Sequence, residues 1–440
     1  MSSELIPFLP VNKESEAYKI ILSPCNAANK SLIKKLKLFL EDNEILNGRI
    51  ILTNTSVSVP VLLKTGLGDQ DLLAFTVYLK GMLNMEEASS INLVSHQPEN
   101  TASKGTLKNL LVQYLRDKNQ DIKMFLPFIP NRYIIYPPMV LFNSNTFDND
   151  AWNGIAGESF FKWILSLFNN CSHLAILNPI IKTDDMRRPL GFLPLYGDFG
   201  PELHEEGFDN PTEEDFKKEF WCHVIQNGIY QTWAPRRTMF SRGNIKEKSR
   251  ILEFRDVQGT DVVDLYAGIG YFTLSYLAKG ANRVYCWEIN PWSIQGLIKS
   301  CKANNHPYCL VRKGESIPAD LNEIKVVIFH ESNEFACTRM KQVVKMDSTF
   351  KLNLSHVNLG LLPSSKQGWQ TALDLINLFN TTTMIHVHEN IHIENFQEQI
   401  ELIRLNLSSS NEVELSFVHK IKTFAPDIWH VCIDYRICNY

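Results

Sequence analysis

Apolar and polar positions in the C-terminal part of the chain alternate in the order strand, turn and helix. Residues 261–265, DVVDL, form a short β-branched run, and Gly268 and Gly270 follow it. Residues 271–279 then carry apolar positions at helical spacing. Glycines leave space where the backbone must approach a ligand closely. This pattern predicts a binding site of nucleotide size, although similar turns also occur in α/β proteins that bind no nucleotide.

The next apolar run, residues 283–289, adds an acid at its end. Glu288 follows Asp264 at about the interval, roughly 20 residues, at which an acid on the second strand of a doubly wound sheet binds ribose hydroxyls. Thr273 occupies the position of the third glycine in the dinucleotide fingerprint. The pattern therefore favours S-adenosylmethionine over NAD as the ligand, while a solvated acid at a strand end is the alternative interpretation of Glu288.

The alternation continues to the C-terminus and ends in a hairpin. Residues 355–362 and 382–390 are predicted strands, with a helix at 370–379 between them, and 412–421 and 429–437 are predicted to form a terminal hairpin. A last antiparallel strand is typical of S-adenosylmethionine-dependent transferases. The predicted fold is α/β, a doubly wound, Rossmann-like transferase sheet with a terminal antiparallel hairpin, plus an N-terminal α+β region.

A chain of 440 residues is expected to hold two or three domains. We expect an N-terminal region at 1–150, a connecting region at 151–235 and a cofactor domain at 236–440. Residues 86–105 and 143–154 are rich in Ser, Asn, Asp and Gly and are predicted to be loops.

Two further segments carry structural predictions. Residues 31–40, SLIKKLKLFL, place Leu32, Ile33, Leu36 and Phe39 on one helical face, which predicts a helix facing the core, with a phosphate-contacting helix as the alternative. Residues 159–169 are a predicted aromatic-rich helix and 173–181 a buried strand. The polar segment 182–216 is rich in Pro and Gly and is predicted to form ordered loops without strand or helix.

The composition limits the partners. The net charge is −4 and the pI is about 6.3, so nucleic acid binding requires local basic patches and DNA is not an expected partner. Nine cysteines without a C-x-x-C pair favour reduced thiols and a cytoplasmic protein without a metal site. No apolar run approaches 20 residues, so neither secretion nor membrane insertion is expected.

Residues 233–250 form a local basic segment. Its cations are Arg236, Arg237, Arg242, Lys246, Lys248 and Arg250. Trp233 and Phe240 add stacking surfaces, and aromatic and cationic side chains together suit unstacked RNA. The alternative is a solvated helix start in which Glu247 pairs locally. Because the segment directly precedes the glycine turn, we expect Ser241 and Lys248 to reach the cofactor and Arg242 the substrate.

Three histidines alternate on one predicted strand, His386, His388 and His392. Such spacing can indicate a metal site, but histidines on one strand face without an accompanying acid pattern more often pack and form hydrogen bonds. We therefore expect no metal.

Six segments together resemble one family. They are SRGNIKEKSR (241–250), DLYAGIGYFTL (264–274), WEINPWSIQGL (287–297), VNLGLLPSS (357–365), MIHVHEN (384–390) and KTFAPDIWHV (422–431). The set resembles the eukaryotic, fungal-type aminocarboxypropyltransferases of wybutosine synthesis, relatives of the tRNA guanine-37 N1-methyltransferases, and covers roughly residues 187–440. The resemblance implies transfer of the 3-amino-3-carboxypropyl group of S-adenosylmethionine to 4-demethylwyosine, a tricyclic base, at position 37 of tRNA(Phe). It also implies binding of the anticodon loop, with residues 1–150 positioning the tRNA.

The resemblance also implies site residues. Ser241, Lys248 and Glu288 are expected to bind the cofactor, together with Asp264, Tyr266, Gly268 and Gly270 of the strand and turn. The pair after the third strand, Asp-Asn in many relatives, corresponds either to Glu315 and Ser316 or to Ser332 and Asn333. Arg242 and Asn358 are the candidate catalytic residues, and no general base is assigned.

Three alternative functions predict different sequence features. The guanine-37 methyltransferases carry an Asn-Pro-Pro type sequence after the fourth strand, whereas residues 358–363 here read NLGLLP, without a second proline. A non-catalytic RNA-binding protein on the same fold is disfavoured because Gly268, Gly270 and Glu288 are all present. A small-molecule methyltransferase would not require the basic segment.

Overall fold

The computed structural model describes residues 15–23, 35–40, 51–52, 57–64, 67–83, 90–95, 107–130, 132–147, 149–178, 188–189, 191–202, 204–346, 352–408 and 411–438. The chain divides into two compact units, Met1–Gly105 and Thr106–Tyr440. The boundaries expected near residues 150 and 235 both lie inside the second unit. Within the described residues, no helix is long and apolar enough to cross a membrane.

The first unit contains a four-stranded antiparallel sheet. Its strand order is β2 (Ile51–Leu52), β3 (Val57–Lys64), β1 (Ser15–Ser23) and β4 (Ser90–Ser95). Helix α2 (Asp69–Leu83) contributes Phe75, Leu79 and Leu83 to the core. The prediction of a loop over 86–105 was wrong for β4, whose Ile91 is buried in this core.

The N-terminal helical segment is described over residues 35–40. Leu36 and Leu40 are fully buried, whereas Lys35 and Lys37 are exposed. This arrangement agrees with the core-facing interpretation, because the apolar side chains lie in the core of the first unit. The other predicted core positions, Leu32 and Ile33, lie outside the described residues.

The second unit begins with a smaller α/β layer. Helices α3 (Leu107–Asp117), α4 (Ile122–Phe125) and α5 (Glu158–Ser166) accompany a sheet of β5 (Tyr133–Tyr136), β6 (Met139–Asn143), β7 (His173–Leu177) and β8 (Phe192–Tyr196), with the short 3-10 helices η3 (Leu126–Phe128) and η4 (Asp150–Trp152). Leu111, Trp152 and Phe160 share one core, so the boundary expected near residue 150 passes through packed side chains. Part of the segment 182–216 forms β8, which pairs with β7. The prediction that this segment forms loops without a strand was therefore wrong at β8. Helix α6 (Glu205–Asp209) also lies in that segment and α7 (Glu213–Lys218) begins in it, so the expectation of no helix there was wrong as well.

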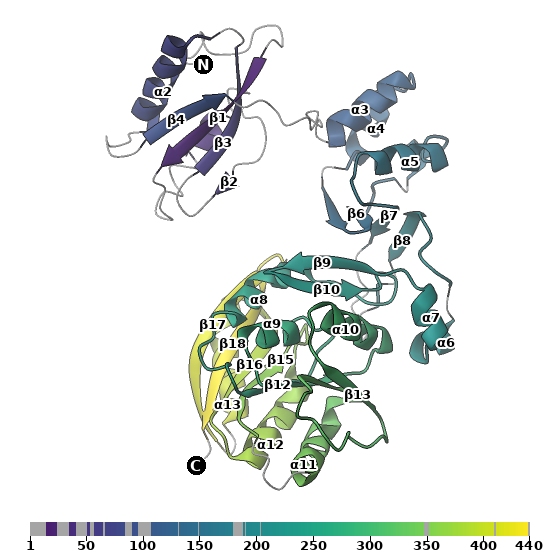
Figure 1. Cartoon of the computed structure of the whole chain (residues 1–440), viewed down its shortest axis with the longest axis vertical. Coiled ribbons are helices and arrows are strands. Elements are labelled where there is room, and N and C mark those ends of the chain that lie inside the picture. The colour runs from purple at the N-terminus through teal and green to yellow at the C-terminus, as the bar shows by residue number, and fades with distance from the viewer. Residues whose placement is uncertain are drawn as a thin grey trace. The chain divides into compact units, whose positions relative to one another are not determined.

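The large sheet of the second unit has eight strands. In chain order they are β11 (Asp261–Asp264), β12 (Arg283–Glu288), β13 (Tyr308–Arg312), β14 (Val326–His330), β15 (Leu354–Leu359), β16 (Thr383–His392), β17 (Glu412–Ala425) and β18 (Ile428–Cys438). The spatial order is β13-β14-β12-β11-β15-β16-β18-β17, with β13 and β17 at opposite edges (Figure 1). Strands β11 to β16 are parallel, and β18 is antiparallel to β16 and β17. The predicted doubly wound fold with a terminal antiparallel hairpin is confirmed.

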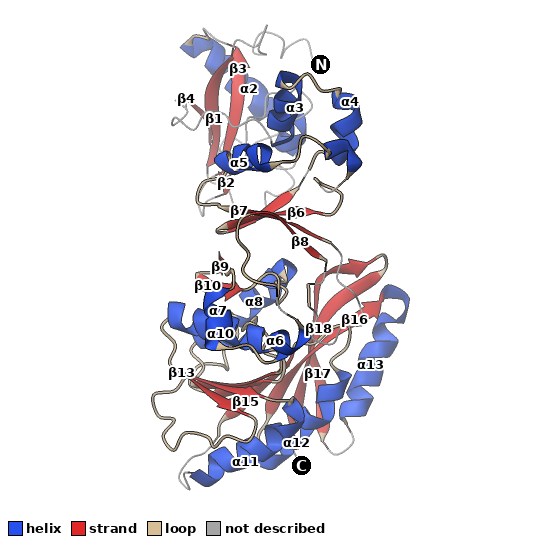
Figure 2. Ribbon diagram, turned by 90° about the vertical axis from the view of Figure 1, so that its right-hand side faces the viewer, coloured by secondary structure: helices blue, strands red, loops and turns tan. Residues whose placement is uncertain are grey.

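Helices cover both faces of this sheet because successive strand residues point to opposite sides. Val262 and Cys286 lie in the core with α9 (Thr273–Lys279) and α10 (Pro291–Ala303). Val263 and Trp287 lie in the opposite core with α11 (Ala336–Met346), α12 (Trp369–Phe379) and α13 (Phe396–Leu407). Figure 2 shows α10 on one side of the sheet and α11 and α12 on the other.

A hairpin and a short helix precede the large sheet. Strands β9 (Cys222–Gln226) and β10 (Ile229–Trp233) are antiparallel, and the 3-10 helix η5 (Arg242–Asn244) continues directly into α8 (Ile245–Ile251). Strand β11 lies where the strand order reverses, between β12 and β15. In open α/β sheets, ligands bind outside the carboxyl ends of the strands at this point.

Candidate functional site

The turn after β11 is held by the buried carboxylate of Asp264. Its Oδ2 accepts a hydrogen bond from Thr273 Oγ1 at 2.7 Å, and its Oδ1 accepts one from Asn358 Nδ2 at 3.0 Å. Burial raises the pKa of Asp264, although these donors oppose the shift. Asp264 and Asn358 are each at most 1% exposed. In this structure the two predicted site residues therefore join β11 to β15 beneath the turn.

Glu288 closes the same turn from the end of β12. Its Oε2 accepts a hydrogen bond from Gly268 N at 2.8 Å, and its Oε1 accepts bonds from Ile289 N and Asn290 N at 3.0 and 2.8 Å. Loss of solvent raises the pKa of Glu288, and the backbone donors oppose this change. The residue as a whole is partly exposed. Glu288 therefore fixes the backbone of the glycine turn and also presents a carboxylate at its edge.

The two glycines are required for different reasons. Gly268 has φ +55° and Gly270 has φ +83°, a region that disfavours residues with a side chain. A Cβ at position 270 would also lie 2.6 Å from Leu297 Cδ1 on α10. The turn thus combines a left-handed backbone with close packing of α10 beneath it.

The pairing of the strands distinguishes the two candidate residue pairs, of which one follows β13 and the other follows β14. Strand β14 lies directly beside β12, and β13 forms the edge of the sheet. Asn333, after β14, donates from Nδ2 to Leu265 O at 2.8 Å and hydrogen-bonds with the side chain of Tyr266. Ser332 accepts a hydrogen bond from Glu334 N. Glu315 is exposed after β13, where its carboxylate accepts a hydrogen bond from Arg312 N. The structure therefore brings Asn333 to the start of the glycine turn, with Ser332 preceding it in the chain.

Lys248 is buried on α8 and lies beneath the glycine turn. Its Nζ donates to Gln226 Oε1 at 3.0 Å and to Gln231 Oε1, and it lies 4.7 Å from the centre of the Phe240 ring. Gln231 Nε2 in turn donates to Gly270 O at 3.0 Å. Burial lowers the pKa of Lys248 to about 7. Lys248 thus supports the turn through Gln231, a residue that the sequence pattern did not indicate.

Ser241 and Arg242 lie at the start of η5. Ser241 Oγ donates to Asn244 Oδ1 at 3.1 Å and accepts a hydrogen bond from Lys422 Nζ at 2.9 Å. The side chain of Arg242 is exposed. Lys422 belongs to β17 and was not predicted to lie near this site. Its lysine-rich strand segment was a possible signal, but strand periodicity alone does not indicate which face it takes.

The basic segment is less accessible than predicted. Trp233 is 2% exposed and stacks on Phe240 with ring centres 4.3 Å apart, so its prediction as an RNA-stacking surface was wrong. Arg237 pairs with buried Glu219, and Arg236 pairs with Glu202. These side chains instead join the segment after β10 to residues 200–219. Among the six cations of the segment, Arg242 and Lys246 have exposed side chains.

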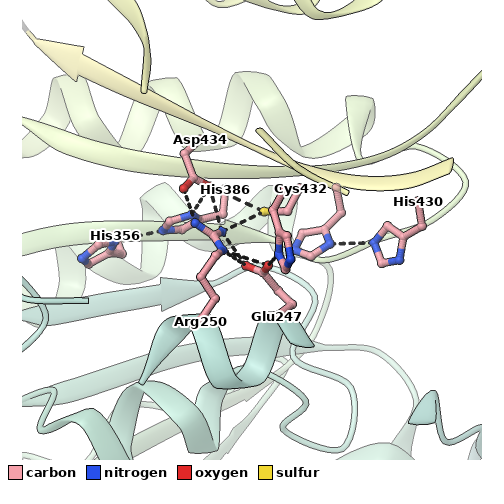
Figure 3. A network of polar contacts seen from close by, with 9 residues as sticks. Glu247, Arg250, His356, His386, His430, Cys432 and Asp434 are labelled. Atoms are coloured by element: carbon pink, nitrogen blue, oxygen red, sulfur yellow. Dashed lines mark hydrogen bonds and ion pairs between the residues drawn. The ribbon is translucent and has the colours of Figure 1, made fainter. Parts of the chain in front are cut away.

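A buried polar network joins α8 to β16 and β18 (Figure 3). Arg250 binds Glu247 and Asp434, and His386 Nδ1 donates to Asp434 Oδ1 at 2.7 Å. His386 also lies within hydrogen-bond distance of His356. The expected packing and hydrogen bonding are observed for His386. Glu247 does pair locally, but in a buried position and not in a solvated one.

Two groups in this network have the residue types of metal ligands. They are Glu247, His388 and Cys432, and His386, Cys432 and Asp434. The guanidinium of Arg250 bonds with Glu247, Asp434 and Cys432 Sγ, so a positive charge already lies between the two groups. A cation bound here would be repelled by that charge. His388 Nδ1 lies 2.9 Å from His430 Nε2, within hydrogen-bond distance. His392 is the N-cap of η8 (Ile393–Asn395), and its side chain accepts a hydrogen bond from Glu394 N.

The sheet order and the glycine turn define the class of protein. A parallel doubly wound sheet, an antiparallel strand inserted before its edge strand, and an acid that holds the turn after the first strand are the features of an S-adenosylmethionine-dependent transferase. Residues 223–347 match the TRM5/TYW2 methyltransferase domain. The chain is thus an enzyme of this class.

Two curated relatives extend the similarity over most of the chain. The tRNA wybutosine-synthesizing protein 2 of Saccharomyces cerevisiae is 35% identical, over 92% of this chain and 96% of the relative. The protein of the same name from Schizosaccharomyces pombe is 40% identical, over 70% and 72% respectively. The chain belongs to the tRNA wybutosine-synthesizing protein 2 family.

Solved structures support the fold. The crystal structure of P. horikoshii TYW2 in complex with MeSAdo has 16% sequence identity and a TM-score of 0.53, and the similarity covers 75% of this chain and 99% of that one. At this identity the likeness concerns the fold alone.

Proposed function

We propose that this chain transfers the 3-amino-3-carboxypropyl group of S-adenosylmethionine to 4-demethylwyosine at position 37 of tRNA(Phe). The by-product is methylthioadenosine. The observation that carries the proposal is the similarity to wybutosine-synthesizing proteins over nearly the whole chain. The glycine turn, Glu288 and Asn333 at the carboxyl ends of β11, β12 and β14 support S-adenosylmethionine as the co-substrate.

Placement of the sulfonium decides which group is transferred. Its sulfur carries three electrophilic carbons, and the carbon that lies in line with the nucleophilic ring carbon is the one that reacts. Holding two reactants in a near-attack geometry contributes about 7–11 kcal/mol to catalysis. The sulfonium is already a good leaving group, so the chemistry demands alignment more than an acid. The new carbon–carbon bond forms as the carbon–sulfur bond breaks, and the ring carbon then loses its proton.

The proposed roles of individual residues follow from their positions. Glu288 binds the ribose hydroxyls, since it is a partly exposed residue at the end of β12, next to the glycine turn. Arg242, exposed at the start of η5, contacts the RNA or its target base. Asn358 acts through Asp264, to which its amide is bonded, and so positions the carboxyl end of β15.

The proposed macromolecular substrate is the anticodon loop of tRNA(Phe). The exposed cations Arg242 and Lys246 support this proposal, since they lie on η5 and α8, and Lys248 of α8 is linked to the glycine turn through Gln231. Residues 1–150 are the proposed tRNA-positioning region. A cytoplasmic location is also proposed, with support from the cysteine pattern of the sequence.

A labelling experiment tests the proposed function. The enzyme is incubated with tRNA that carries 4-demethylwyosine and with S-adenosylmethionine labelled either in the carboxyl group or in the methyl group. The proposal predicts carboxyl label in the tRNA and methyl label in the small-molecule by-product. Methyl label in the tRNA without carboxyl label would instead identify a guanine-37 type methyltransferase.

A further inference from the structure

Two lysines on β17 lie on opposite faces of the sheet although they are two positions apart. Lys420 Nζ is 4.3 Å from the centre of the Phe396 ring on α13. Lys422 Nζ donates to Ser241 Oγ, next to η5, on the side that carries α8. Residues i and i+2 of a regular strand point to the same face. A local irregularity must therefore redirect one of them.

A β-bulge provides that change of direction. Lys420 pairs with Val431 on β18 and Lys422 pairs with His430, so Ile421 is the additional residue. Val431 belongs to the core beneath α13, whereas His430 contacts His388 on the α8 side. Bulges next to active sites commonly re-aim a side chain. This bulge brings Lys422 to the face that holds the glycine turn.

Gly243 provides the space that Lys422 occupies. A Cβ at position 243 would lie 2.5 Å from Lys422 Cδ and 3.2 Å from its Nζ. Gly243 does not have the left-handed backbone of the two turn glycines. Space for the lysine chain, and not backbone conformation, is therefore the structural reason for glycine at this position.

The segment that receives Lys422 runs beside the glycine turn. Tyr271 follows Gly270 directly, and its hydroxyl donates a hydrogen bond to Met239 O. The Phe240 ring stacks near Tyr271, with ring centres 6.1 Å apart. Ser241 is the next residue. The contact between Lys422 and Ser241 thus lies within a few residues of the backbone where the cofactor is proposed to bind.

We propose that Lys422 Nζ and Ser241 Oγ form an anion-binding subsite that receives an anionic oxygen group of a substrate. Two sources have this chemistry, the carboxylate of S-adenosylmethionine and a phosphate of the bound RNA. The Lys422 ammonium can donate charge-assisted hydrogen bonds to either, and the Ser241 hydroxyl can donate one after turning away from Asn244 Oδ1. The assignment rests on the proposed function for the identity of the substrates, but binding alone tests it.

The test compares Lys422→Gln with Lys420→Gln as a matched control in the full chain. Calorimetry measures S-adenosylmethionine binding without tRNA, and filter binding measures tRNA binding without S-adenosylmethionine over a range of salt concentrations. One lost charge-assisted hydrogen bond corresponds to a loss of affinity of about 10-fold or more. If the anion is the carboxylate, Lys422→Gln weakens S-adenosylmethionine binding. If it is an RNA phosphate, tRNA affinity falls and the slope of log K against log salt decreases by about one.

A second variant, at Gly243, keeps Lys422 but fills the space that its side chain occupies. Gly243→Ala is expected to displace the Lys422 chain and to weaken the same substrate, and thermal melting confirms that both variants are folded. If Lys422→Gln binds both substrates as well as Lys420→Gln does, or if Gly243→Ala leaves both affinities unchanged, the subsite is refuted. The label-transfer experiment is independent, since the subsite can fail while carboxyl label still reaches the tRNA.

Discussion

Arg250 on α8 is paired through both terminal nitrogens with Asp434 on β18. The Nη1–Oδ2 distance is 2.5 Å and the Nη2–Oδ1 distance is 3.1 Å, and the residues lie 184 positions apart in the chain. The same guanidinium binds Glu247 one turn earlier on α8. This pair connects the terminal hairpin to the helix that carries Lys248, so the last strands of the fold help to position the glycine-turn region.

Breaking this pair is expected to destabilise the protein. Asp434→Ala leaves Arg250 with one of its two carboxylates and leaves His386 without its acceptor, and losing one partner of a buried ion pair costs about 3–5 kcal/mol of unfolding free energy. Urea unfolding measures the change. The control, Glu401→Ala, breaks the exposed pair with Arg404, and we expect little effect from it. Equal effects of the two variants would contradict the assigned role of Asp434.

The buried ring of His388 predicts acid sensitivity that begins near pH 6.5. Burial lowers the pKa of His388 from 6.5 to about 4. Between these pH values the unfolded chain binds a proton that the folded chain does not, so stability falls as the pH is lowered from about 6.5 to 4. His388→Gln should flatten this dependence, as measured by urea unfolding at several pH values. Exposed His204 supplies the control His204→Gln, which should keep the wild-type slope. A slope unchanged in His388→Gln would count against neutral burial of this ring.

Lys248 predicts a second pH dependence, in the alkaline range. Its pKa is lowered from 10.5 to about 7 by burial, so the unfolded chain binds the extra proton between these values. Stability should therefore rise as the pH increases from about 7 to 10. Lys248→Met should lose this rise, whereas Lys246→Met, which changes an exposed neighbour on α8, should retain it. Denaturant unfolding between pH 7 and 10 measures the free energy of unfolding. If the rise in stability persists in Lys248→Met, a group other than Lys248 causes it.

Glu288 and Glu315 provide a direct comparison of the two sheet positions. Glu288→Ala removes the acceptor of Gly268 N and the proposed acceptor of the ribose hydroxyls. Each charge-assisted hydrogen bond contributes about 1.5–3 kcal/mol, so S-adenosylmethionine affinity should fall by at least 10-fold in calorimetry. Glu315→Ala, on the edge of the sheet, should bind normally. Normal binding by Glu288→Ala would remove this residue from the site.

The sequence predicted the large sheet well because local patterns determine its elements. Short β-branched strands, two glycines and Pro291 at a helix start each indicate structure within a few residues of themselves. The sequence left open whether Glu315 and Ser316 or Ser332 and Asn333 follow the third strand, because pairing beside β12 is a non-local property. The fold places Asn333, and not Glu315, beside the turn for the same reason.

The failures of prediction have a common physical cause. Trp233 was predicted to present a stacking surface for RNA, but its ring packs against Phe240 and Tyr136. Lys248, an expected cofactor-binding residue, is buried next to the rings of Phe240 and Tyr271. The bulge that directs Lys422 toward Ser241 is also invisible in strand periodicity, because the extra residue shows only when β17 pairs with β18. Contacts between distant segments decide which polar residues reach the site.

The identity of the nucleoside by-product distinguishes transfer of the aminocarboxypropyl group from transfer of the methyl group. The full-length enzyme is incubated with S-adenosylmethionine and tRNA(Phe) carrying 4-demethylwyosine, and the nucleosides released are separated and quantified against the modified tRNA. Methylthioadenosine is expected in equal amount to the modified base, with none formed when tRNA is omitted. Release of S-adenosylhomocysteine in that amount, with a methylated base in the tRNA, would contradict the proposed transfer.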